Sequence, residues 1–127
     1  MTQAEAFPIG DPGTITGYHA HIYYSPETRA PAARLRERIW DKFAPVEMGR
    51  FRDRAVGPHP VPMYQVAFRR DLFSEIVPWL MANRDGFTIL VHPESGDPFR
   101  DHAHWPLWLG QKLNLDLDWL KRGNREA

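Results

Sequence analysis

The chain has 127 residues, with sixteen basic and sixteen acidic side chains and no cysteine. That length suits one domain, and the balanced charge provides no global field that would attract nucleic acid or an anionic membrane. The lack of cysteine excludes disulfides, thiolate zinc sites and cysteine nucleophiles, and it favours a cytoplasmic protein. Residues 1–13 contain no apolar run typical of a signal peptide or membrane anchor. We therefore expect a flexible leader at 1–13, a single domain at 14–120 and a flexible tail at 121–127.

In the first half of the chain, residue patterns predict three strands and one helix. A strand is expected over 15–24, which is rich in β-branched and aromatic side chains. A helix is expected over 31–43, because apolar residues recur there every three or four positions and proline suits the first turn. A second strand is expected over 47–56 and a third over 63–68, with a turn at 57–60 between them.

The second half completes the fold. Asp71 is expected to cap a second helix, whose apolar stripe covers 72–81 and in which Pro78 predicts a kink. A fourth strand is expected over 87–92. The order predicts an α+β, ferredoxin-like βαββαβ sandwich, with a four-stranded antiparallel sheet and two helices on one face. The alternation over 113–119 fits a fifth, C-terminal strand and also a helix; we favour an extended segment packed on the sheet or on a second copy in a homodimer.

The chain has six histidines, and strand alternation indicates where three of them lie. Alternate side chains of a strand share a face, so His19 and His21 should lie opposite the apolar set that meets the helices. The same alternation places His92 on that uncovered face, and in the ferredoxin-like order the first and fourth strands are antiparallel neighbours. We therefore expect these three imidazoles to converge in a metal site. His59, in the turn, is expected at the opposite end of the sheet.

The loop after the fourth strand can fold over the same corner as a wall or lid. It carries two further histidines and three carboxylates, namely His102, His104, Glu94, Asp97 and Asp101. Arg52 belongs to a group of three arginines on the second strand. The default interpretation of that group is a solvated edge of the sheet. The more specific alternative is that one of the three arginines binds a carboxylate.

Several sequence pieces, spread from about Ile15 to Leu120, together resemble the DOPA 4,5-dioxygenase family of fungi and bacteria. They are Tyr18-His19-Ala20-His21, His92-Pro93 followed by Ser95-Gly96-Asp97, Asp101-His102 and Trp108-Leu109-Gly110. The resemblance implies a ferredoxin-like catalytic domain with a non-haem Fe(II) centre. It implies extradiol cleavage, by O₂, of a catechol such as DOPA or caffeate. It also implies that His19, His21 and His92 hold the metal, with His102 and His104 beside them.

Under this hypothesis His102 or His104 acts as acid and base, because a loop histidine approaches the substrate without filling a metal position. Arg52 and Asp101 are the candidates for binding the substrate. Non-haem Fe(II) oxygenases commonly use two histidines and one carboxylate, so either the loop supplies a carboxylate or the site is all-histidine. An all-histidine site also suits zinc, which substitutes for iron without its redox chemistry.

Two other functions remain open from the sequence. The first is a non-catalytic, dimeric binding module with a structural or adventitious zinc ion. The second is a lyase or isomerase that uses another divalent metal on a similar scaffold. Metal content and O₂ consumption distinguish both from a dioxygenase.

Overall fold

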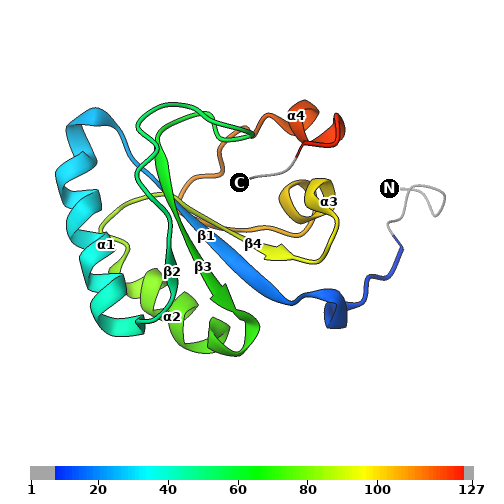
Figure 1. Cartoon of the computed structure of the whole chain (residues 1–127), viewed down its shortest axis with the longest axis horizontal. Helices are drawn as coiled ribbons and strands as arrows, with labels where there is room; N and C mark the ends of the chain where they lie inside the picture. The colour runs from blue at the N-terminus through cyan, green and yellow to red at the C-terminus, as the bar shows by residue number, and fades with distance from the viewer. Residues whose placement is uncertain (1–7, 125–127) are drawn as a thin grey trace.

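The structure is a computed structural model, which describes residues 8–124. Its main element is an antiparallel sheet of five strands (Figure 1). The order in the sheet is β2-β3-β1-β4-β5, with β1 in the centre. The predicted α+β, ferredoxin-like class is confirmed, and the additional strand lies beside β4. The strands are β1 (Gly17–Tyr23), β2 (Glu47–Met48), β3 (Met63–Arg69), β4 (Ile89–Glu94) and β5 (Leu107–Leu109).

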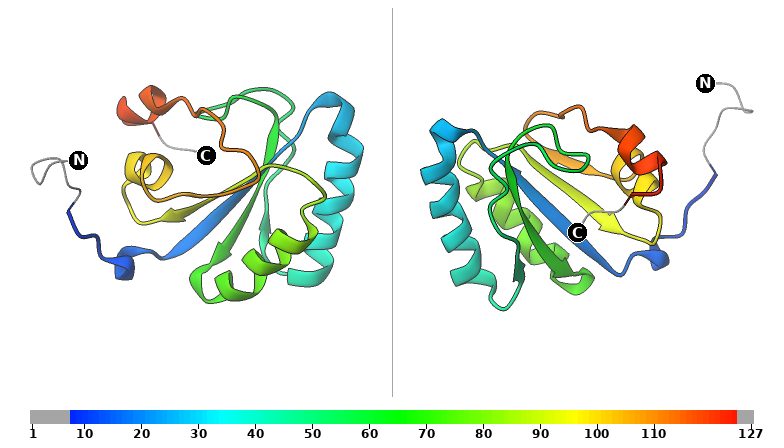
Figure 2. Two further views of the ribbon diagram at one scale, coloured as in Figure 1. Left: turned by 180° about the vertical axis from the view of Figure 1, so that it is seen from behind. Right: turned by 45° about the horizontal axis from the view of Figure 1, so that its top comes forward.

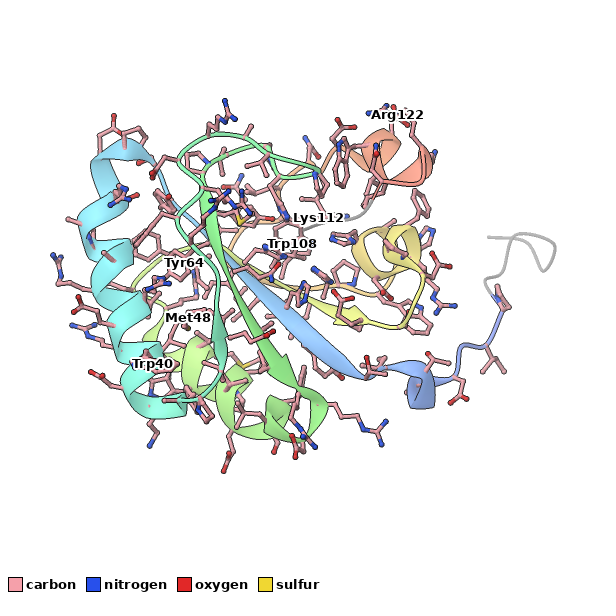
Figure 3. The ribbon with its side chains drawn as sticks, in the orientation of Figure 1. Trp40, Met48, Tyr64, Trp108, Lys112 and Arg122 are labelled. Carbon is pink, nitrogen blue, oxygen red and sulfur yellow. The ribbon has the colours of Figure 1, made fainter. Side chains whose placement is uncertain are left out.

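Two helices, α1 (Arg29–Phe43) and α2 (Phe73–Asn83), cover one face of the sheet (Figure 2). The expected apolar stripes are buried there against alternate residues of the strands. Tyr64 of β3 points to the same side, and its hydroxyl donates to the Ala32 carbonyl over 2.9 Å (Figure 3). The expected N-cap of α2, Asp71, is wrong by one residue: Asp71 lies in a 3₁₀ turn at Arg70–Leu72 that precedes the helix, and Leu72 occupies the N-cap.

The opposite face of the sheet, which carries the histidines, is covered, so the expectation of an uncovered face is wrong. Two short helices, α3 (Pro98–Ala103) and α4 (Leu117–Lys121), lie on this side (Figure 2). Large apolar side chains on the strands explain the cover, because exposing them to water would be costly. The second apolar cluster comprises Tyr23, Met63 and Leu90, with Val61, Trp108, Leu113 and Leu115 packed on it.

The C-terminal strand lies earlier in the sequence than the expected 113–119. β5 occupies Leu107–Leu109, whereas 111–116 has no regular structure and a helix follows it. Leu113 and Leu115 both pack on the sheet face, which is the extended arrangement favoured by their alternation. Trp108 of β5 stacks with Tyr23 at a centroid distance of 6.1 Å (Figure 3).

The second predicted strand is much shorter than 47–56. Regular pairing covers only Glu47–Met48, and a single bridge joins Arg52 to Met63. The chain then leaves the sheet, and the Asp53 carboxylate accepts hydrogen bonds from the side chains of Tyr24 and Arg29. The segment 53–62 is therefore free to fold back across the histidine face.

Residues 1–7 and 125–127, which include much of the predicted leader and tail, lie outside the described residues. Within the described chain, Pro12–Thr14 forms a 3₁₀ turn capped by Asp11. None of the helices between residues 8 and 124 has the length and apolar character needed to cross a bilayer.

Candidate metal centre

Three histidines of β1 and β4 meet on one face of the sheet. The register pairs His19 directly with His92, and His21 lies one rung further along the same face. The ring centroids of His19 and His21 each lie 5.1 Å from that of His92. One nitrogen of each ring lies within 4.8 Å of the other two. Strand alternation and antiparallel register are sufficient to produce this group.

The hydrogen bonds of two rings decide which nitrogens face each other. Nδ1 of His92 lies 3.0 Å from the Pro93 carbonyl oxygen, which only accepts, so Nδ1 is the donor and Nε2 keeps its lone pair. Nδ1 of His21 lies 3.4 Å from the sulfur of Met63, a weak acceptor. The two Nε2 atoms are then 3.1 Å apart. The outward contacts of both rings thus direct their Nε2 atoms to one point.

The donor set fits a transition-metal ion. Two imidazole nitrogens bound to one ion at about 2.1 Å are separated by about 3.0–3.4 Å for octahedral or tetrahedral angles. The observed 3.1 Å lies in that range. Nδ1 of His19 is buried and makes no hydrogen bond, although Oε1 of Glu94 lies 3.0 Å away in an unfavourable direction. This nitrogen is therefore available to a cation, and the Glu94 carboxylate lies next to it.

The carboxylates of the adjoining loop have other roles. Within residues 8–124 the close group contains histidines alone, and Glu94 is the carboxylate next to it. Asp97 caps α3 by accepting from the backbone N–H of Arg100. Asp101 is buried and accepts from the backbone N–H and the hydroxyl of Ser95. Asp101, a candidate for substrate binding, is therefore engaged in holding α3 against the end of β4.

Two further histidines, which belong to segments outside the sheet, pack against this group of three. The His102 ring lies 4.0 Å from that of His92, and its Nδ1 donates to the Pro98 carbonyl over 2.6 Å. The His59 ring lies 4.2 Å from that of His21, and its Nδ1 lies 2.7 Å from the Tyr23 hydroxyl. Both side chains are buried.

The expectation that His59 lies at the far end of the sheet is wrong. The segment 53–62 crosses the histidine face, and the Pro58 carbonyl accepts from the backbone N–H of Asp116, which ties this segment to the C-terminal one. The sequence predicted a strand over 47–56, and only the observed end of β2 at Met48 leaves a connection to β3 that is too long for a tight hairpin.

The remaining candidates lie further from the three imidazoles. His104 is exposed at the C-cap of α3, with its ring 5.7 Å from that of Phe99. Arg52 is half-buried and lines a cavity of about 180 Å³ together with Arg50, Gln65 and His59. That cavity adjoins the site on the side where His59 packs on His21.

The comparisons with known proteins agree with one another. The model of the Dopa 4,5-dioxygenase family matches residues 18–119. A DOPA 4,5-dioxygenase of Amanita muscaria is 31% identical over 111 residues, which cover 81% of this chain and 49% of that enzyme. An uncharacterized 21.2 kDa protein of Botryotinia fuckeliana is 37% identical over 124 residues, covering 88% of this chain and 67% of the relative. The chain thus spans about half the length of the Amanita enzyme.

A solved structure is similar over almost the whole chain. It is the crystal structure of a Nostoc punctiforme protein assigned as a dioxygenase, with a TM-score of 0.88 and 47% sequence identity. The match covers 91% of this chain and all of that one. The arrangement of strands and helices described above is therefore shared with a protein of related sequence.

Proposed function

The chain belongs to the Dopa 4,5-dioxygenase family, and from this premise we propose that it is an extradiol dioxygenase that opens the ring of a catechol with O₂ at a non-haem Fe(II) centre. The observation that carries the proposal is the group His19, His21 and His92, with two buried histidines packed on it. A catechol such as DOPA or caffeate is the expected substrate.

The protein side chains have separate tasks in this proposal. His19, His21 and His92 would hold the metal, since their nitrogens lie within 4.8 Å of one another. Bound Fe(II) supplies the redox chemistry with O₂ and lowers the pKa of a coordinated hydroxyl group. The segment 53–62, helix α3 and the C-terminal segment cover the site, which keeps bulk water from the reacting groups.

Proton transfer is the task of a histidine outside the group of three. His102 is the stronger candidate, because its Nδ1 donates to Pro98 and its Nε2 is therefore the acceptor. Its ring lies against that of His92, within reach of a molecule bound at the metal. His104, at the exposed end of the same helix, is the other candidate from the sequence. Arg52 remains our candidate for binding an anionic group of the substrate, from the adjoining cavity.

The test is anaerobic reconstitution with Fe(II), followed by oxygen uptake with a panel of catechols that includes DOPA and caffeate. We expect one iron per chain, one O₂ consumed per catechol and a yellow semialdehyde-type product. Iron-loaded protein that consumes no O₂ with any catechol would show that the proposal is wrong.

One observation favours a second candidate, a zinc-binding module without catalysis. Within residues 8–124 the close group contains no carboxylate, and an all-histidine set suits zinc as well as iron. A dimer formed through the histidine face is disfavoured, because the chain's own C-terminal segment covers this face. Metal analysis of protein purified without chelator, combined with the oxygen assay, separates the two functions.

A further inference from the structure

The cavity of about 180 Å³ lies on the histidine face of the sheet, next to His21. Tyr64 of β3 points to the helices, so its neighbour Gln65, which lines the cavity, points to the histidine face. Gln65 is also the partner of His21 across β1 and β3, so the cavity begins one strand spacing, roughly 5 Å, from that histidine. His59 and Met63, which line it too, contact His21 through a ring and a sulfur atom. A molecule bound at the three imidazoles can therefore extend a short substituent into this space.

The size of the cavity limits what it accepts. Pockets for drug-sized molecules have volumes of about 300–1,000 Å³, so this smaller space holds part of a substrate. Half-buried Val56 and Trp119 form an apolar wall. A β-carbon added to Gly57 would lie 3.4 Å from the Trp119 ring, which shows how closely that ring packs on the 53–62 segment. The cavity thus suits a chain of a few carbons that joins a catechol ring to a polar group.

A β-bulge determines how two arginines reach this cavity. Between Gly49 and Arg52, two residues of one strand lie opposite a single residue of β3, Tyr64. Such a bulge bends the strand and changes the direction of its side chains. Phe51 packs on the larger apolar cluster of the helix face, whereas Arg50 and Arg52 line the cavity.

The charge around the cavity is positive. Among the described residues, its lining includes two arginines and no carboxylate. Asp53, the nearest acid in the sequence, is paired with Arg29. Arg36 adds positive charge behind the wall, since its guanidinium donates to the Gly49 carbonyl over 2.9 Å. The cavity therefore favours a carboxylate, which a guanidinium binds through two parallel hydrogen bonds, and disfavours an ammonium group.

We propose that this cavity binds the carboxylate of a catechol whose side chain carries no amino group, with Arg50 and Arg52 as specificity residues. This inference rests on the proposed function and names a desamino catecholic acid such as caffeate, and not DOPA, as the preferred substrate. DOPA carries an ammonium group beside its carboxylate, which the guanidinium groups repel. Arg52 contributes more than Arg50, because it is half-buried and Arg50 is exposed.

The first experiment compares four catechols with side chains of similar size. Dihydrocaffeate carries a carboxylate, dopamine an ammonium group, DOPA both and 4-propylcatechol neither. In oxygen uptake by the iron-loaded enzyme, kcat/KM should be highest for dihydrocaffeate, about tenfold above DOPA and 4-propylcatechol, and lowest for dopamine. Tenfold is the low end for a hydrogen bond to a charged group. Equal values for all four, or a preference for DOPA over dihydrocaffeate, would overturn the inference and leave the proposed dioxygenase intact.

A second measurement does not depend on turnover. Binding of the same four catechols to the zinc-loaded protein is followed by calorimetry without O₂, because zinc has no redox chemistry. The same order of affinities supports the inference even if no catechol is cleaved. Dopamine that binds as tightly as dihydrocaffeate would contradict it.

Substitution of the arginines locates the bound carboxylate. The measured quantity is the affinity for dihydrocaffeate divided by that for 4-propylcatechol. Arg52→Gln should lower this ratio about tenfold without changing the affinity for 4-propylcatechol, and Arg52→Lys should keep part of it. Arg50→Gln should lower the ratio less, because that side chain is exposed.

Arg54→Gln is the matched control. Arg54 is exposed and does not line the cavity, so this variant should keep the wild-type ratio. Circular dichroism confirms the fold of each variant. If Arg50→Gln and Arg52→Gln both fold and keep the ratio, the carboxylate binds elsewhere and the inference is wrong; if one does not fold, the other decides.

Discussion

The six histidines of this chain differ in what holds each ring. Backbone carbonyls orient two of them, since Pro93 accepts from His92 and Pro98 accepts from His102. A phenol hydroxyl holds His59, and a sulfur atom lies at Nδ1 of His21. Such outer contacts fix the tautomer and direction of a metal-binding imidazole. The residues that surround the rings are therefore as important to the site as the rings themselves.

His92 is the residue whose loss should be most damaging. It lies between the other two imidazoles, with ring centroids 5.1 Å from both. His92→Ala should abolish metal uptake and turnover, measured by metal analysis after reconstitution and by oxygen uptake. Full iron occupancy in the folded variant would refute the assignment of His92 as a ligand.

His102 should affect turnover without affecting metal content. It packs on His92 but belongs to α3 and not to the close group of three. His102→Ala should retain iron and lower kcat by about 10²–10⁴, the usual contribution of a general acid or base. His104→Ala, on the same helix but exposed, should cause a much smaller loss. The reverse order of the two effects would transfer the proton-transfer role to His104.

At the scale of elements, a polar cluster fastens the start of α1 to the loop after β2. Tyr24 donates to Oδ1 of Asp53 over 2.7 Å, and the Arg29 guanidinium donates to both carboxylate oxygens. The hydrogen bonds from Arg29 and then Tyr24 lower the pKa of Asp53 below its usual value. Burial, followed by the hydrogen bond to Asp53, raises the pKa of Tyr24. This cluster therefore ties the loop after β2 to the start of α1.

The cluster predicts a pH-dependent contribution to stability. Because the pKa of Asp53 is lower in the folded chain, its ionised form favours folding at every pH above the unfolded value of about 3.9. That contribution is lost as the pH falls through the lower, folded value. Asp53→Asn should lower the Tm by about one to a few degrees at pH 7, because the group is exposed and screened. The difference from wild type should shrink toward pH 3 in thermal melts. Asp41→Asn, on the exposed side of α1, is the control, and an unchanged difference at low pH would contradict the argument.

Strand faces were predictable from the sequence, and loop paths were not. The two-residue period of a strand and the ferredoxin-like order place His19 opposite His92 without any knowledge of packing. The position of His59 depends on the route of 53–62, which the contacts of Asp53 and Pro58 determine. The alternation of Leu113 and Leu115 indicated one buried side, but did not show that the histidine face is what they bury. Local patterns define an element, whereas its partner depends on the rest of the chain.

At the scale of the whole molecule, the two faces of the sheet have different roles. The face under α1 and α2 holds the larger apolar cluster, whereas the other face combines the histidines with a smaller one (Figure 2). The first face stabilises the fold largely without the site. The second face is assembled from β1, β4, the 53–62 segment and α3, which are distant in sequence. Anything that binds to several of these elements should therefore stabilise the molecule as a whole.

Metal binding should accordingly raise the Tm. An ion held by His19 and His21 of β1 and by His92 of β4 would join the two central strands, and it has no such site in the unfolded chain. Zinc at about 1,000 times its Kd should add about 4 kcal/mol, a shift on the order of 10 °C, measured by calorimetry and reversed by a chelator. His21→Ala should remove most of the shift, whereas His104→Ala should keep it, because that ring is exposed outside the group. If His21→Ala keeps the full shift, the ion binds at another site, and the coupling between the two strands has a different origin.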